Sequence, residues 1–133
     1  MKLMTLVLGL LLLLTGCQSA ATNTAVKTAT TEIRDISVTD TQAAVSKPNT
    51  QFVDVRTVEE YAGGHATNAI NIPLDTIQAK LDTLKKDEPI YLICQTGSRS
   101  RKAADVLKEA GFKTIYNVTG GTSAWKTAGL PMN

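Results

Sequence analysis

Short apolar runs alternate with helical segments and polar turns from residue 33 onward, and this alternation limits the possible folds more than any other feature of the chain. The runs at 52–55, 90–93 and 114–118 are rich in Val, Ile, Phe and Tyr, which is typical of strands buried on both faces. Five segments are predicted as strands: 33–37, 51–55, 69–72, 89–93 and 113–118.

Two sequence signatures of helix starts lie between these strands. Thr57 and Glu60 are spaced as in a capping box, which predicts a short helix after the second strand. Asp75 and Gln78 have the same spacing. Apolar residues follow within 77–84 at intervals of four and three, so a second amphipathic helix is expected there.

Two further helices are predicted over 100–110, ended by Gly111, and over 122–127, which carries Trp125 as a core residue. Strands that alternate with helices over short connections form a parallel sheet covered on both faces. We therefore expect one α/β domain over 32–133. Its sheet is expected to be five-stranded and mainly parallel, with helices on both faces.

The beginning of the chain has a different character. Met1 and Lys2 precede an apolar run over 3–14, which is shorter than the ~20 residues of a membrane span and fits the core of a secretion signal. The sequence Leu-Thr-Gly-Cys at 14–17 resembles the lipobox of bacterial lipoproteins. This resemblance implies a signal peptide over 1–16 and a diacylglycerol on the sulfur of Cys17. An ordinary signal peptide or an uncleaved anchor is the alternative.

Small polar residues follow the expected lipidation site. We interpret 17–31 as the lipidated Cys and a flexible tether with a reach of ~20 Å, because this segment has too few large apolar residues to fold. The lipoprotein resemblance implies an exported protein, anchored in the cell envelope and touching the membrane through its lipid only. Gln18 is not the Asp that usually retains lipoproteins at the inner membrane. The periplasmic face of the outer membrane is therefore favoured in a diderm cell.

Charge and cysteine content narrow the function further. The chain has 14 Lys and Arg and 12 Asp and Glu, and removal of the leader takes away only Lys2, so the mature chain is nearly neutral. No run of five basic residues occurs, so nucleic acid is not an expected partner. With Cys17 acylated, Cys94 is the only free thiol. No internal disulfide can then form, and the domain relies on its apolar core.

Cys94 directly follows the predicted strand 89–93, and a helix starts a few residues later. The free N–H groups and the dipole of that helix start favour a thiolate and can hold an anion. Gly97 allows the backbone to curl so that successive N–H groups point inward, and Arg99 and Arg101 add positive charge. The alternative is a buried structural Cys at a strand end.

The segment Cys94-x-x-Gly97-x-Arg99-Ser100 resembles the active loop of rhodanese-family sulfurtransferases. Blocks before and after it resemble that family's signatures in the same order, so the likeness covers nearly the whole chain beyond residue 33 and implies a rhodanese-like fold. The earlier block contains Asp54-Val55-Arg56, Glu60-Tyr61-x-x-Gly64-His65 and Ala69-Ile70-Asn71-Ile72-Pro73, and the later block contains Val118-x-Gly120-Gly121-x-x-Ala124-Trp125 and Gly129-Leu130-Pro131.

The resemblance implies sulfur transfer through a persulfide on Cys94. The expected partners are a small sulfur-containing anion, such as thiosulfate, as donor and a thiol or cyanide as acceptor. Neither a metal nor an organic cofactor is implied, and we expect a monomer. The residues expected to hold the donor and the persulfide are Gln95, Thr96, Gly97, Ser98 and Arg99.

Other signature residues are interpreted as structural. Asp54 and Arg56 flank a strand end and are expected to form an ion pair or a loop brace. His65 is the chain's only histidine, yet a thiolate favoured by a helix start needs no base, so we expect it to support the scaffold. Gln95 stands where many relatives that use thiosulfate carry Arg, which leaves mercaptopyruvate or a protein persulfide open as the natural donor.

Two rival functions remain open. One is a phosphatase or arsenate reductase, whose loop cradles a tetrahedral oxyanion in a Cys-x5-Arg segment. Cys94 and Arg99 are one residue closer than that, and Arg101 is one residue too far, so this rival is disfavoured. The other is a non-catalytic rhodanese-like module that carries sulfur or docks a partner. Such modules usually lack the Cys that this chain keeps.

Overall fold

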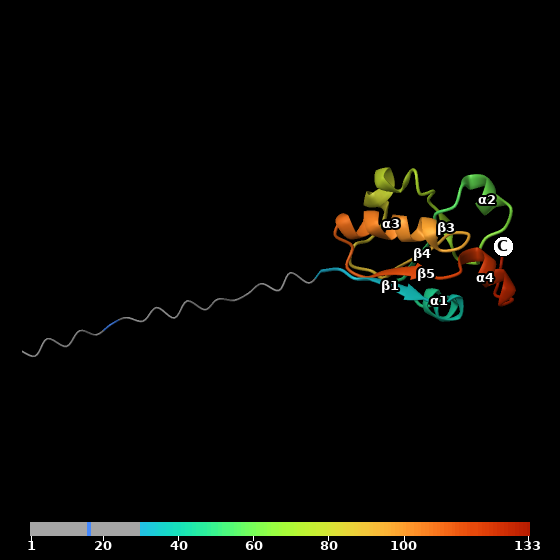
Figure 1. Cartoon of the computed structure of the whole chain (residues 1–133), viewed down its shortest axis with the longest axis horizontal. Helices are drawn as coiled ribbons and strands as arrows, with labels where there is room; N and C mark the ends of the chain where they lie inside the picture. The colour runs from blue at the N-terminus through green and yellow to red at the C-terminus, as the bar shows by residue number, and fades with distance from the viewer. Residues whose placement is uncertain (1–15, 17–29) are drawn as a thin grey trace, which may run out of the picture.

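A computed structural model of the chain describes residue 16 and residues 30–133. Strands and helices alternate along this part of the chain, and most connections between them are short (Figure 1). The elements are β1 (Ile33–Ile36), α1 (Val38–Val45), β2 (Gln51–Asp54), α2 (Val58–Ala62), β3 (Ile70–Asn71), the 3-10 helix η1 (Ile77–Thr83), β4 (Ile90–Ile93), α3 (Ser98–Glu109), β5 (Ile115–Val118) and α4 (Gly121–Thr127).

The five strands form one sheet in the order β1-β5-β4-β2-β3, and every neighbouring pair is parallel. The predicted five-stranded α/β fold is therefore confirmed. The antiparallel contact recorded in residues 30–133 is an isolated bridge between Ala66 and Met132, outside the sheet's strands. All four residues of β4 are buried. β4 is also the middle strand of the five, so the residue that follows it lies at the centre of the sheet's carboxyl edge.

Helices cover both faces of the sheet, as expected (Figure 1). On one face Val53 and Leu92 pack with Leu107 of α3, and η1 adds Ile77. On the other face Phe52 packs against Trp125 of α4, with ring centroids 5.5 Å apart. Trp125 is almost fully buried, which confirms its prediction as a core residue. Alternate residues of β2, β4 and β5 thus pack into two separate apolar layers.

Helix α1 was not expected from the sequence. Its residues give no clear apolar stripe, but Ser37 caps it by accepting a hydrogen bond from the Asp40 N–H at 3.1 Å. Val38 and Thr41 are its buried residues, and the Thr41 hydroxyl donates to the Ser37 carbonyl. The predicted strand 33–37 includes Ser37, whereas β1 ends at Ile36 and Ser37 is the N-cap of α1.

The segment after Asp75 also differs from its prediction. It forms η1 rather than an amphipathic α-helix, and its start has no side-chain cap. Bonds between residues three apart tighten its ends, from Ala79 N–H to Thr76 and from Leu84 N–H to Leu81. In a 3-10 helix residues three apart share one side, so Leu81 and Leu84 can both face the core over a short path.

The predicted leader over 1–16 falls almost wholly outside the described residues. The lipidation site Cys17 and the tether lie there as well, except for residues 30 and 31. Within the part that is described, no helix is long and apolar enough to cross a membrane.

Candidate active site

Cys94 lies at the carboxyl end of the central strand β4, and α3 begins four residues later. Ligands of parallel α/β sheets bind at this edge of the sheet. The residue is 1% exposed and packs with the apolar layer under α3. Its sulfur therefore lies at the floor of the loop that joins β4 to α3.

Gly97 turns the loop so that a backbone N–H faces the sulfur. Its φ of 110° is left-handed, a conformation that side-chain-bearing residues rarely adopt. In this conformation the Gly97 N–H donates to the Sγ of Cys94 at 3.1 Å. α3 starts at Ser98, so the dipole of a 12-residue helix is directed at the same atom.

Behind the sulfur runs a chain of polar contacts that the sequence did not reveal. The Oγ of Ser100 lies 3.3 Å from Cys94 Sγ and donates to Asn117 Oδ1 at 2.6 Å. The Nδ2 of Asn117 donates to Asp35 Oδ1 at 3.1 Å. Ser100 and Asn117 are buried on α3 and β5, so only their Ser and Asn identities within apolar patterns could have marked them.

The single proton of Ser100 limits what this chain of contacts does. While its hydroxyl donates to Asn117, it can only accept from the Cys94 S–H. It can bond a thiolate only after the proton turns from Asn117 to the sulfur. The backbone N–H of Gly97 needs no such turn and is the donor that stabilises a thiolate in the geometry observed.

The net electrostatic effect favours the thiolate. Burial raises the pKa of the Cys94 thiol, but the Ser100 hydroxyl, once its proton turns to the sulfur, and the nearby backbone N–H groups lower this pKa by more. Those N–H groups belong to Ser100, Gly97 and Thr96. The pKa of Cys94 therefore lies below the ordinary value of a thiol, which increases the fraction of the nucleophilic form at neutral pH.

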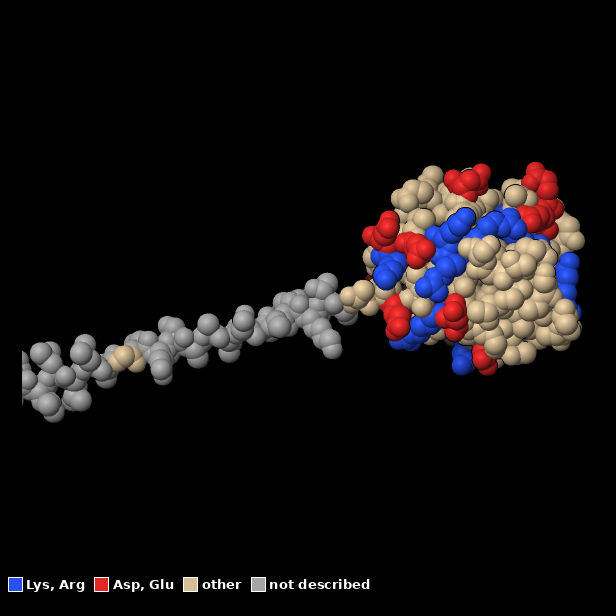
Figure 2. Space-filling model, in the orientation of Figure 1, with Lys and Arg blue, Asp and Glu red and all other residues tan. Residues whose placement is uncertain are grey.

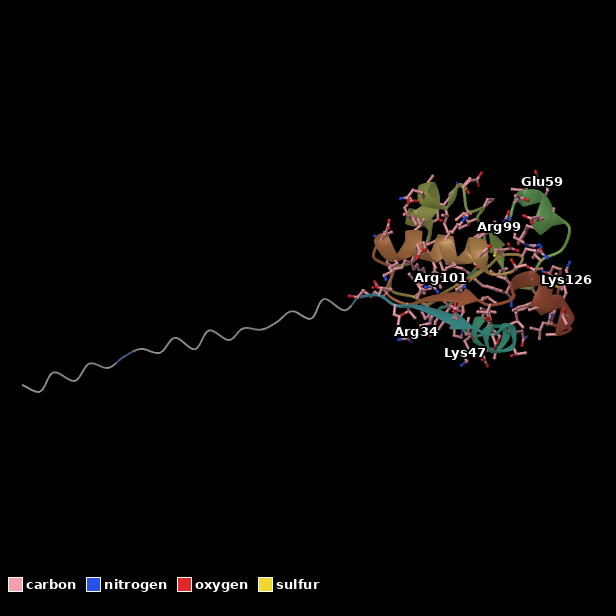
Figure 3. The ribbon with its side chains drawn as sticks, in the orientation of Figure 1. Arg34, Lys47, Glu59, Arg99, Arg101 and Lys126 are labelled. Carbon is pink, nitrogen blue, oxygen red and sulfur yellow. The ribbon has the colours of Figure 1, made fainter. Side chains whose placement is uncertain are left out.

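Arg99 is paired with a carboxylate. Its two terminal nitrogens bond the two carboxylate oxygens of Glu60 at 2.7 and 2.8 Å. Arg101, also expected to add positive charge, lies 3.6 Å from Asp35 on β1. Figure 3 shows Arg99 at the α2 end of α3 and Arg101 nearer to β1. The positive charges of Arg99 and Arg101 are thus offset by carboxylates, and the sequence did not predict either pairing.

The remaining loop residues differ in their roles. The side chain of Gln95 bridges outward, since its Oε1 accepts from Arg56 at 3.4 Å and its Nε2 donates to Ser123 at 2.8 Å. Thr96 and Ser98 are exposed. Of the predicted binding residues, Gly97 makes the direct hydrogen bond of 3.1 Å to the sulfur, and the Thr96 N–H contributes less to the lowered pKa of Cys94.

Asp54 and Arg56 form a buried ion pair at the end of β2. The guanidinium bonds the carboxylate through Nε and Nη2, the latter at 2.7 Å, and Nη2 also donates to the Gly64 carbonyl at 2.9 Å. This arrangement ties the strand end to the segment before His65. The Nδ1 of His65 lies 3.0 Å from the carbonyl of Tyr61, and the two rings stack.

The start of α4 holds the loop from the opposite side. The Thr122 N–H and hydroxyl both donate to the Cys94 carbonyl, at 2.8 and 3.1 Å, and the Ser123 N–H donates to the Gln95 carbonyl at 3.1 Å. Gly121 has no side chain because a Cβ there would strike the Cys94 and Gln95 backbone. The Gly120-Gly121 pair thus allows close contact between backbones, which its sequence alone did not disclose.

Charged side chains of both signs lie on the face shown in Figure 2. Figure 2 shows basic and acidic side chains interspersed over α3 and a broad area without charged residues near α4. Two cavities, of about 450 and 240 Å³, are lined by residues outside the 94–99 loop. No group of three His, Cys, Asp or Glu able to hold a metal occurs in residues 30–133.

Comparison with known families gives one match that covers most of the chain. Residues 37–128 match the family described as "Rhodanese-like domain". This range contains every strand except β1, all the helices and the whole 94–99 loop.

Individual relatives include two that are named for sulfur transfer or sulfur carriage and one that is uncharacterized. The chain is 37% identical over 103 residues to the putative sulfurtransferase YtwF of Bacillus subtilis, covering 77% of this chain and 99% of that protein. It is 41% identical over 75 residues to the uncharacterized protein YqhL of B. subtilis, covering 56% of this chain and 60% of YqhL. The matched segment spans 45% of a third relative, the putative sulfur carrier protein YrkF.

Solved structures agree on the fold. The crystal structure of a rhodanese-related protein from Thermoplasma volcanium is similar with a TM-score of 0.68 at 30% identity. The similarity covers 75% of this chain and 97% of that one.

Proposed function

Because the chain belongs to the rhodanese-like domain family, we propose that it is a sulfurtransferase in which Cys94 carries the transferred sulfur as a persulfide. The donor is a small anion with a sulfane sulfur, such as thiosulfate, and the acceptor is a thiol or cyanide. The observation that carries the proposal is the 3.1 Å hydrogen bond from the Gly97 N–H to Cys94 Sγ at the end of a central strand.

In the first half-reaction the Cys94 thiolate attacks the outer sulfur of the donor. With thiosulfate, a new S–S bond forms as the donor's S–S bond breaks, and sulfite leaves with the electron pair. Cys94 then carries a persulfide anion. The developing negative charge stays beside the amides at the start of α3, which are already oriented before the reaction.

In the second half-reaction the acceptor attacks the outer sulfur of the persulfide. Cyanide leaves as thiocyanate, or a thiolate leaves as a new persulfide, and the Cys94 thiolate is regenerated. Neither half-reaction requires a general base, because the hydrogen bonds at the loop already favour the thiolate. This fits the position of His65, whose Nδ1 bonds the Tyr61 carbonyl.

The orientation of Arg99 favours sulfur transfer over phosphate chemistry. A phosphatase loop directs its arginine fork at the bound dianion. Here the fork of Arg99 holds Glu60 instead. Together with the short spacing from Cys94 to Arg99, this geometry disfavours a phosphatase or an arsenate reductase.

Intact-mass measurement tests the proposal. The full chain with Cys17→Ser, so that Cys94 is its only thiol, is incubated with a sulfane donor and weighed. A gain of one sulfur mass is expected, with loss of that mass and release of thiocyanate on addition of cyanide. The variant that also carries Cys94→Ser should gain nothing. If no donor adds mass, a non-catalytic module is the better description. Phosphate release from a monoester without thiocyanate would instead indicate a phosphatase.

We further propose that the chain is a monomeric lipoprotein exported to the cell envelope, on the periplasmic face of the outer membrane in a diderm cell. Its support is the 14–17 sequence. Cells fed an alkyne analogue of palmitate should label the wild type but not Cys17→Ser, and outer-membrane fractions should contain the label. Gel filtration in detergent should give the mass of one chain, and a membrane-free, unlabelled wild type would contradict the proposal.

A further inference from the structure

The arginines around the Cys94 loop all hold carboxylates. This pairing leaves the sulfur surrounded by hydrogen-bond donors, while the guanidinium groups of Arg56, Arg99 and Arg101 are each paired with a carboxylate. Gln95, which is uncharged, adds no cation to the loop. The three pairs are Arg56 with Asp54 at 2.7 Å, Arg99 with Glu60 at 2.7 Å and Arg101 with Asp35 at 3.6 Å.

Of these carboxylates, Glu60 is the one held against the loop itself. Its two oxygens fill both terminal nitrogens of Arg99, and Oε2 also accepts the Thr57 N–H at 2.9 Å. In return the Thr57 hydroxyl accepts the Glu60 N–H, which completes the capping box of α2. Glu60 therefore cannot swing away from Arg99 without opening the start of its own helix.

The pair stays charged, and Arg99 is near enough to Cys94 for their charges to interact. Hydrogen bonds from Arg99 and from Thr57 lower the pKa of Glu60 to about 2, so its carboxylate remains ionised at any ordinary pH. The bond to Glu60 raises the pKa of Arg99, burial opposes this, and the charges of Glu60, Cys94 and Asp54 raise it further. Arg99 thus interacts with the charge of Cys94, and Glu60 offsets that interaction.

A carboxylate fixed beside an anion site penalises donors according to their charge. Coulomb repulsion scales with the charge of the donor, so a dianion is repelled about twice as strongly as a monoanion at the same place. Arg99 is a third exposed, at 32%, and Glu60 is 36% exposed, so solvent weakens the effect but does not remove it.

We propose that Glu60 determines donor specificity by occupying Arg99, so that Cys94 takes sulfur preferentially from sulfane donors with one negative charge or none. This inference rests on the proposed sulfur transfer. With methanethiosulfonate, a monoanion, the Cys94 thiolate attacks the sulfane sulfur, the S–S bond of the donor breaks, and methanesulfinate leaves with the electron pair. The persulfide formed is the one that thiosulfate would give.

The two donors make a matched pair, because methanethiosulfonate has a methyl group where thiosulfate has a charged oxygen. We would measure kcat/KM for both with cyanide as acceptor, using the full chain with Cys17→Ser. The test variant is Glu60→Gln, which removes the charge but keeps a residue suited to the capping box. The control is Glu59→Gln on the same helix turn. Figure 3 shows Glu59 on the side of α2 that faces away from Arg99.

Glu60→Gln should raise kcat/KM for thiosulfate about fivefold more than for methanethiosulfonate. High salt should shrink the difference. Glu59→Gln should change the ratio by less than about twofold. A change in thiolate fraction alters both donors equally and cancels in the ratio. Arg99→Gln, which leaves Glu60 unpaired, should move the ratio in the opposite direction.

An unchanged ratio in Glu60→Gln, or the same ratio change in Glu59→Gln, would overturn the inference. Thermal melts of each variant separate an effect on folding from an effect on donor choice. If the parent chain forms a persulfide from neither donor, the proposed sulfur transfer fails instead.

Discussion

Helices α3 and α4 begin in the same way but use their first N–H groups for different purposes. Each has a glycine at its N-cap with a positive φ, 110° at Gly97 and 76° at Gly120, and neither has a side-chain cap. At α3 the Gly97 N–H donates to the Cys94 sulfur. At α4 the N–H groups of Thr122 and Ser123 donate to the carbonyls of Cys94 and Gln95.

A Ser, Thr, Asp or Asn cap would have satisfied some of these donors locally. Glycine leaves them free, and the fold directs one set to a reactive atom and the other to the backbone that carries this atom. The comparison suggests a division of tasks, in which the start of α3 activates Cys94 and the start of α4 fixes its position. Four substitutions test whether these tasks are separable.

The largest effect is expected from Gly121→Ala, which disrupts the contact between the start of α4 and the Cys94 loop. Its Cβ would strike the backbone of Cys94 and Gln95 at a φ of 55°. Strain and overpacking together should cost about 3 kcal/mol or more of unfolding free energy, measured by urea denaturation, and most of the activity. Gly129→Ala is the control, because its φ is 68° but nothing lies within 4 Å. Equal losses in both variants would show that strain alone matters.

The next largest effect is expected from Gly97→Ala, which disturbs the hydrogen bond from the Gly97 N–H to the Cys94 sulfur. A Cβ there meets only ordinary contacts, the nearest at 3.6 Å, so the cost is the strain of a φ of 110°, about 1–2 kcal/mol. Relief of this strain turns the N–H from the sulfur. The pKa of Cys94 should rise, and alkylation by iodoacetamide at pH 7 should slow about tenfold.

Gly111→Ala is the matched control for that substitution. Its φ is 89° and nothing lies within 4 Å, so it carries similar strain at the far end of α3, without contact to the sulfur. The profile of alkylation rate against pH should move to higher pH only in Gly97→Ala. An unmoved profile in that variant would refute the activating role of the amide.

A smaller change is expected from Ser100→Ala. Loss of the hydroxyl removes a donor available to the thiolate and should raise the pKa of Cys94, slowing alkylation at pH 7 by roughly threefold. It also leaves Asn117 Oδ1 without its partner, at a cost of about 1–2 kcal/mol in thermal melts. Ser46→Ala, at the end of α1, should leave the pH profile unchanged. Faster alkylation in Ser100→Ala would mean that the hydroxyl stabilises the thiol instead.

The smallest effect is expected from Thr122→Val, which removes one hydrogen bond between the start of α4 and the Cys94 loop and keeps the shape of the side chain. The hydroxyl bond to the Cys94 carbonyl is lost, but the backbone bond from the Thr122 N–H remains. About 1 kcal/mol of stability should be lost, with no shift in the pH profile. Thr127→Val, whose hydroxyl bonds an exposed carbonyl, should cost a few tenths. A shifted profile in Thr122→Val would show that the two tasks are coupled.

Most of the sheet and the position of Cys94 were predictable, because strands buried on both faces leave continuous apolar runs such as 90–93. The capping box from Thr57 to Glu60 was also predictable, because its two partners lie three residues apart in the sequence. The structure confirms both of its bonds. Helix α1 was not predictable, because its cap Ser37 directly follows β1 and the strand pattern extends to it without a break.

The partners of the loop could not be predicted, because each is distant in sequence. Glu60 was visible as a capping residue, but its bond to Arg99 spans 39 positions and depends on where the fold places the start of α2 relative to the start of α3. The partner of Asn117 is equally hard to predict, because a single Asn in an apolar strand gives no indication of which buried hydroxyl it bonds. A sequence pattern reports the periodicity of one element, whereas these contacts join two elements.

The bonds from Thr122 to the Cys94 carbonyl connect residues 28 positions apart, and this spacing has a consequence for biosynthesis. A ribosome makes the β4 segment and the 94–99 loop before it makes α4, and domain-scale folding waits for the later segment. Until α4 docks, the loop lacks the contacts that set its shape, and the cysteine has the modest reactivity of one in an unfolded chain. The lowered pKa of the Cys94 thiol is therefore a property of the completed domain, because the Cys94 loop takes its shape only when α4 is in place.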